Sequence, residues 1–112
     1  MNALEIAVRY NDLLTLYAPL ITETQREILE DYFGFNLSLT EIAENRHCSR
    51  SAVEDAIKKG KSKLEKLEKQ IGNYALLLDI YDMKTKTSNL ETLRVLDEVE
   101  RMLKHGIWVL NR

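Results

Sequence analysis

Apolar side chains recur along residues 53–81 in alternating steps of four and three residues. The positions in this heptad seam are Val53, Ile57, Gly60, Leu64, Leu67, Ile71, Tyr74, Leu78 and Tyr81. Such spacing places one apolar line along one side of a helix, so it predicts a long helix packed against another helix. Glycine lowers helix stability by about 1 kcal/mol relative to alanine. We therefore expect any bend or break at Gly60 or Gly72.

The remaining helices are predicted from their capping residues. A polar side chain followed three residues later by Glu or Gln can satisfy free backbone amides at a helix start. This pattern occurs at Asn2, Thr22, Ser38 and Ser88, and Ser49 is a fifth candidate cap. The helices are expected over residues 3–17, from 23 to Gly34, over 39–45, from 50 onward, and after 88. Pro19 should end the first helix, and Gly34 should end the second with left-handed backbone. No strand pattern competes, so the fold class is predicted to be all-α.

Length and composition exclude several functional classes. A chain of 112 residues predicts one domain-sized core rather than a two-domain enzyme. We find no apolar run that could cross a bilayer, no secretory leader pattern, and one cysteine, which predict a cytoplasmic protein without membrane partners. We see no nucleophile–base pair, no carboxylate pair with an apolar pocket and no metal-ligand cluster. The sequence therefore predicts no enzyme, no cofactor and no metal site.

Charge is distributed unevenly, although the net charge is only −2. Residues 49–70 contain seven lysines and arginines against four carboxylates, whereas residues 1–48 contain three against eight. The only basic surplus therefore lies in residues 49–70. We expect an anionic partner to contact that segment.

Residues 38–59 have the pattern of a helix-turn-helix motif. A short helix to about Asn45 is followed by a turn over residues 46–48 and by a second helix capped by Ser49. Ile42, Cys48, Val53 and Ile57 are expected to pack between the two helices, with small Ala43 at their crossing. His47 stands where such a turn needs positive φ, a conformation that is uncommon for a residue other than glycine.

In helix-turn-helix proteins the start of the second helix enters the DNA major groove. The predicted DNA-binding residues are Ser49, Arg50, Ser51, Glu54, Lys58, Lys59 and Lys61. Arg50 has the donors to read guanine, and Glu54 can accept from the amino group of cytosine. The lysines, together with Lys63, would contact phosphates. Asp55 also points outward there, and its charge, like that of Glu54, opposes DNA binding.

Residues 21–68 resemble the YlxM family of small helix-turn-helix proteins, and they are similar to the C-terminal DNA-binding domain of bacterial sigma factors. The matching residues are Gln25-Arg26, Leu29, Tyr32-Phe33, Leu37-Ser38-Leu39, Glu41-Ile42-Ala43, Ser49-Arg50, Ala52-Val53 and Asp55. The resemblance implies a wingless helix-turn-helix bundle with a long fourth helix, a helical C-terminal tail and a cytoplasmic regulatory role in bacteria. It also implies a link to the signal recognition particle pathway. The turn at residues 46–48 departs from the family, which has Gly or Asn followed by an aliphatic residue.

Two regions are expected, a DNA-binding-like domain over residues 1–70 and a helical extension over residues 71–112 for packing or dimerisation. The heptad seam predicts a homodimer, whose alternative is that the last helix folds back on residues 71–81 of the same chain. An alternative function is that of a protein-interaction adaptor, which acts on the GTPase of the signal recognition particle pathway or on its RNA. Trp108 then lies on the interaction surface rather than against the first helix.

Overall fold

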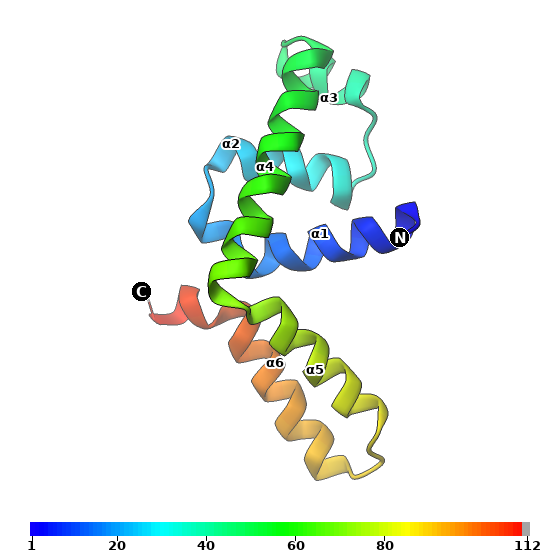
Figure 1. The fold of residues 1–112 in the computed structure, drawn as a ribbon, viewed down its shortest axis with the longest axis vertical. Coiled ribbons are helices and arrows are strands. Elements are labelled where there is room, and N and C mark those ends of the chain that lie inside the picture. Colours follow the sequence, from blue (N-terminus) through cyan, green and yellow to red (C-terminus); the bar gives the residue numbers. More distant parts are fainter. Residues whose placement is uncertain (111–112) are drawn as a thin grey trace.

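The computed structural model describes residues 1–110, with side chains through residue 105, and every regular element in that part of the chain is helical (Figure 1). The elements are α1 (Ala3–Tyr17), the 3₁₀ turn η1 (Ala18–Leu20), α2 (Glu23–Leu29), the π-helical turn η2 (Glu30–Gly34), α3 (Leu39–Arg46), α4 (Arg50–Ile71), α5 (Asn73–Thr85) and α6 (Leu90–Leu110). The predicted all-α fold class is confirmed.

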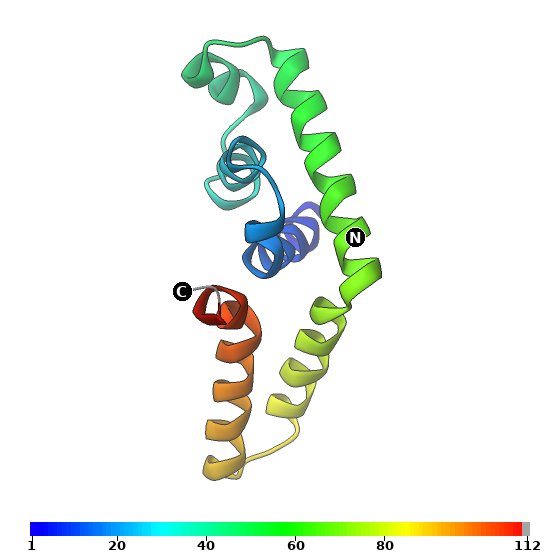
Figure 2. The same cartoon turned by 90° about the vertical axis from the view of Figure 1, so that its left-hand side faces the viewer.

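Helix α4 is the element against which the first three helices assemble. It contacts α1, α2 and α3 along one side, and α5 and α6 form an antiparallel hairpin beyond its C-terminal end (Figures 1 and 2). Helix α1 contacts both α4 and the hairpin, so it lies between the two parts of the molecule. The result is an elongated bundle with principal-axis extents of 51 × 34 × 23 Å.

The predicted caps explain most of the helix starts. Thr22 and Ser38 each form a complete capping box, in which the cap side chain and the third-position side chain exchange hydrogen bonds with backbone amides. Asn2 accepts from the amide of Glu5 at 2.8 Å. Ser49 accepts from the amide of Ala52 at 3.0 Å, without a reciprocal partner, as the sequence predicts.

Two predicted helix ends are wrong by a residue or two. Asn89, not Ser88, caps α6, because its Oδ1 accepts from the amide of Thr92 at 3.1 Å and Asn is as good a cap as Ser. The left-handed residue after η2 is Asn36, with φ 55°, and Gly34 does not have positive φ. The π-helical turn ends at Gly34, the expected last residue, but without left-handed backbone there, since the amide of Phe35 donates to the carbonyl of Glu30 at 3.0 Å.

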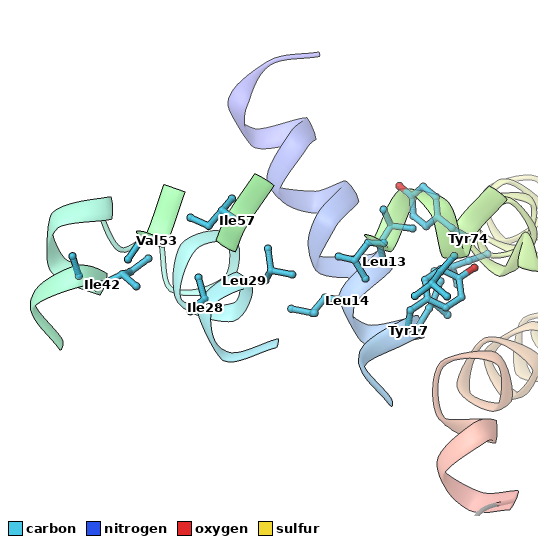
Figure 3. Packing of buried hydrophobic residues seen from close by; sticks show 14 residues of the cluster. Leu13, Leu14, Tyr17, Ile28, Leu29, Ile42, Val53, Ile57 and Tyr74 are labelled. Atoms are coloured by element: carbon cyan, nitrogen blue, oxygen red, sulfur yellow. The ribbon is translucent and has the colours of Figure 1, made fainter. Parts of the chain in front are cut away.

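The core is one continuous cluster that spans α1 to α5, shown in Figure 3. Its largest fully buried side chains come from α1, α2, α3, α4 and α5 alike. They are Tyr17, Leu13, Leu29, Ile42, Leu64, Leu77 and Val53, and Ile80 of α5 is fully buried outside this cluster. Burial of apolar area at about 25 cal/mol per Å² makes this cluster the main source of stability.

The heptad seam is continuous as far as Leu67, and beyond it Tyr74 is buried as predicted but Ile71 and Leu78 are not. Gly72 has φ 78° and interrupts the helix, and the next buried residues are Tyr74, Leu77 and Ile80. Ile71 and Leu78, which the seam places inside, are 43% and 46% exposed. The left-handed residue changes the direction of the helix, so the buried line of α5 is out of phase with that of α4.

The seam is buried within its own chain. Residues 53–67 of the seam pack on α1, α2 and α3, and α6 folds back on α5. The intrachain alternative for the last helix is therefore confirmed. The seam is therefore not available to pair two subunits.

The prediction for Trp108 concerns a side chain that lies outside the described residues.

Glu68 joins α4 to α5 across the break. Its carboxylate accepts from the hydroxyl of Tyr17 at 2.6 Å and from the amides of Tyr74 and Ala75 at 2.8 and 3.2 Å. The Tyr17 hydroxyl in turn accepts from the amide of Asn73 at 3.0 Å. Side chains from two other elements thus replace the carbonyl partners that the first amides of a helix lack.

Candidate nucleic-acid interface

Helices α3 and α4 form the predicted helix-turn-helix. The turn begins at His47, which has φ 54° and ψ 44°, so the prediction of a left-handed residue at this position is confirmed. The amide of Cys48 donates to the carbonyl of Ala43 at 3.0 Å and that of His47 to Glu44 at 3.3 Å. This pair of bonds is a Schellman motif, which ends α3 and directs the chain into α4.

Apolar contacts set the angle between the two helices. Ile42 and Val53 are fully buried, and Ala43 and Ile57 are 6% and 7% exposed. Cys48 is exposed, so the prediction that it packs between the helices is wrong. The Schellman turn carries residue 48 away from the crossing, and the apolar side chains of α3 and α4 close the crossing without it.

Arg46 fixes α3 to the preceding helix. Its Nη2 lies 3.1 Å from a carboxylate oxygen of Glu27 in α2 and 3.5 Å from one of Asp31. The Nε of the same side chain is buried and has no hydrogen-bond partner among the described residues. These ion pairs connect the first helix of the helix-turn-helix to α2 and η2.

Most of the predicted contact residues lie together on the exposed leading turns of α4. Ser49, Arg50, Ser51, Glu54, Asp55, Lys58 and Lys59 are all exposed. Lys59 forms an ion pair with Asp55 at 3.0 Å, so one of the two outward carboxylates is neutralised by its own helix. Arg50 and Lys58 have no ion-pair partner among the described side chains.

Lys61 lies apart from this surface. Its side chain is half-buried, and its Nζ lies 5.1 Å from the centroid of the Tyr10 ring in α1. The interaction is a cation–π contact that attaches α4 to α1. Lys61 therefore has a packing role, and its ammonium does not share the surface of Arg50 and Lys58.

Sequence reasoning missed how the carboxylates of α4 are used. Glu65 accepts two hydrogen bonds from the guanidinium of Arg9, at 2.8 and 2.6 Å, and this pairing lowers the pKa of the Glu65 carboxyl. Glu68 is held at the start of α5. Arg9 lies 56 positions before Glu65, and Tyr17 lies 51 positions before Glu68. The other partner of Glu68, the amide of Tyr74, lies beyond the break at Gly72. No local sequence pattern therefore indicated these contacts.

The described part of the chain offers little else that resembles a chemical site. Its His, Cys, Asp and Glu side chains form no group of three that could hold a metal ion. No helix in the same part is both long and apolar enough to span a membrane.

The fold and this site define a helix-turn-helix protein. The chain belongs to the UPF0122 family, described as "Putative helix-turn-helix protein, YlxM / p13 like", whose family model matches residues 4–102. The predicted family resemblance is confirmed.

Three relatives illustrate the match. A UPF0122 protein of Limosilactobacillus reuteri is 49% identical over 67 residues, which are 60% of this chain and 59% of that protein, so the match spans less than two thirds of that relative. A UPF0122 protein of Malacoplasma penetrans is 40% identical over 95 residues, covering 82% of this chain and 88% of the relative. One of Clostridium kluyveri is 33% identical over 114 residues, covering 93% and 100%.

Proposed function

We propose that this protein is a cytoplasmic regulatory protein that binds duplex DNA through the leading turns of α4. The observation that supports the proposal is the exposure of these turns on a helix-turn-helix whose two helices share a buried apolar contact. Other elements pack on the opposite side of α4, so an incoming duplex meets no obstacle. The major groove of B-DNA is wide enough for an α-helix, whereas that of A-form RNA is too narrow for side chains to read, which favours DNA.

Each exposed side chain has a proposed role. Arg50 donates two hydrogen bonds to a guanine edge, and Glu54 accepts from a cytosine amino group. Ser49 and Ser51 offer hydroxyls to phosphates near the helix start, and Lys58 and Lys59 contact phosphates farther along. The proposed set leaves out Lys61, whose ammonium lies over Tyr10.

The experiment is a titration of labelled duplex DNA by fluorescence anisotropy at low salt, using a pool of random duplexes followed by sequencing of the bound fraction. Arg50→Ala should relax the preference at one base pair and weaken specific binding by about 1–3 kcal/mol. Arg94→Ala is the matched control, because Arg94 is an exposed arginine on α6, which lies at the other end of the molecule from α3 (Figure 1). If the wild-type protein binds no duplex at low salt, the proposed function is refuted.

A second candidate is the adaptor function, with the signal recognition particle GTPase or its RNA as partner. It is favoured by apolar side chains left exposed on α6: Val95 at 57%, Val99 at 40% and Met102 at 61%. Their spacing of four and three residues forms one line on the helix, and contiguous exposed apolar surface marks interaction sites. Capture of partners by tagged protein, with and without nuclease, distinguishes a protein target from a nucleic-acid target.

We propose the same apolar line of α6 as the surface of a homodimer, because the heptad seam is buried. Val99→Ser should then lower the mass measured by sedimentation equilibrium from dimer to monomer. The division into residues 1–70 and 71–112 also stays a proposal. It predicts that limited proteolysis cuts first near Gly72, and cutting elsewhere would contradict it.

A further inference from the structure

The cations of α4 differ from those of the rest of the molecule in their partners. Outside α4, most described cations form ion pairs: Arg9, Arg26, Arg46, Lys84, Lys86, Arg101 and Lys104 do so, and Arg94 does not. On α4, Lys59 is the one described cation with such a partner. The fold therefore leaves the positive charge of α4 uncompensated, although the whole chain is acidic.

The carboxylates of α4 explain this imbalance. Glu65 is occupied by Arg9 of α1, and Glu68 by Tyr17 and the start of α5. Both are partly buried and turned toward the body of the protein. Of the four lysines on the opposite side of α4, Lys63, Lys66 and Lys69 have no ion-pair partner among the described side chains, and Lys59 pairs only with Asp55 of the same helix.

These lysines form a ridge on the outer side of α4. The lysine ridge consists of Lys59, Lys63, Lys66 and Lys69, all of them exposed. At about 1.5 Å per residue the ridge is about 15 Å long, which corresponds to about four base pairs of B-DNA. Figure 2 shows that no other described element covers the outer side of α4.

We propose that the lysine ridge is a phosphate-binding surface that lies along the backbone of a DNA duplex. The inference rests on the proposed DNA-binding function and adds the orientation of the helix. A helix that entered the groove end-on would keep Lys63, Lys66 and Lys69 away from the duplex. The ridge reaches phosphates only when α4 lies lengthwise in the groove, with its outer side toward the DNA.

The test is the salt dependence of binding to a 30-base-pair labelled duplex. Each phosphate contact contributes about −0.9 to the slope of log K against log salt concentration. The triple variant K63Q/K66Q/K69Q should therefore flatten the slope by about 2.7 and weaken binding at low salt by more than about tenfold, equally for all sequences. Circular dichroism should be unchanged, because the three side chains are exposed.

The matched control is K86Q/R94Q/R101Q, which removes the same charge from exposed positions on the hairpin and its loop. It should leave the slope within about 0.5 of the wild-type value. Equal slopes for the two triple variants would show a net-charge effect and overturn the ridge. An unchanged slope for K63Q/K66Q/K69Q, with Arg50→Ala still defective, would overturn the ridge and retain the proposed function. Binding to polyglutamate is measured in the same way. If K63Q/K66Q/K69Q lost binding to polyglutamate but still bound DNA as the wild type does, the ridge would be assigned to an acidic protein partner instead.

Discussion

Replacement of Glu68 should destabilise the whole molecule, because its carboxylate satisfies three donors at the α4–α5 break. Two of these are backbone amides of α5, and the third is the hydroxyl of Tyr17, a residue with no exposed surface. Burial and the hydrogen bond to Glu68 raise the pKa of Tyr17 to about 12, so the phenol remains a donor throughout the neutral range.

The magnitude follows from these contacts. Loss of a capping side chain costs about 0.5–2 kcal/mol, and a buried hydroxyl left without its acceptor costs about 1–3 kcal/mol. Since the two effects share one carboxylate, we expect Glu68→Ala to lower the free energy of unfolding by about 2–4 kcal/mol. Glu68→Gln keeps an acceptor oxygen but loses the charge, and should cost about half as much.

Urea denaturation followed by circular dichroism measures the effect, with Lys69→Ala as the control on the exposed side of the same helix. A double-mutant cycle with Tyr17→Phe should give a coupling of at least about 0.5 kcal/mol. If Glu68→Ala changed stability no more than Lys69→Ala, or showed no coupling to Tyr17→Phe, the account of the break would be refuted.

Other substitutions test the packing and the turn. Gly60→Ala should destabilise by about 1–2 kcal/mol in urea denaturation, because the added Cβ would lie 2.8 Å from a methyl of fully packed Leu29; equal or greater stability would contradict this. His47→Gly should raise the melting temperature by about 2–4 °C, since glycine relieves the left-handed strain, whereas His47→Ala should not. The hydrogen bonds from Arg9 lower the pKa of the Glu65 carboxyl. The contribution of Glu65 to the free energy of unfolding is therefore complete above the ordinary carboxylate pKa, and it is lost as the pH falls through the lowered pKa. The stability difference between wild type and Glu65→Gln should therefore shrink in acid, and a constant difference from pH 7 to pH 3 would count against it.

Local patterns in the sequence predicted the local structure well. The bounds of α1 and the capping boxes at Thr22 and Ser38 are as expected, and so is the left-handed His47. Each of these depends on residues within one helical turn of one another. A short-range pattern is therefore sufficient for them.

Features that depend on tertiary contacts could not be read in this way. Gly72 was one of the two positions expected to break the helix, but the exposure of Ile71 and Leu78 was not predicted, because both keep the spacing of the seam. Cysteine is a residue type that is usually buried, but the geometry of the turn places Cys48 on the surface. Lys61 resembled the other lysines of α4 until Tyr10, 51 positions earlier, was placed beneath it.

The position of α1 between α4 and the hairpin affects the order in which the chain can fold. Arg9 and Tyr17 bond to residues 56 and 51 positions later, so α1 lacks these partners until most of α4 has been made. Loops of that length close slowly, and exposed apolar surface in the meantime favours aggregation. A nascent chain that has emerged from the ribosome only as far as α3 therefore has η2 as a partner for α1, through the Tyr10–Phe33 ring contact, but lacks α4. Completion of α4 is the earliest point at which the whole core of α1 to α4 can form during translation.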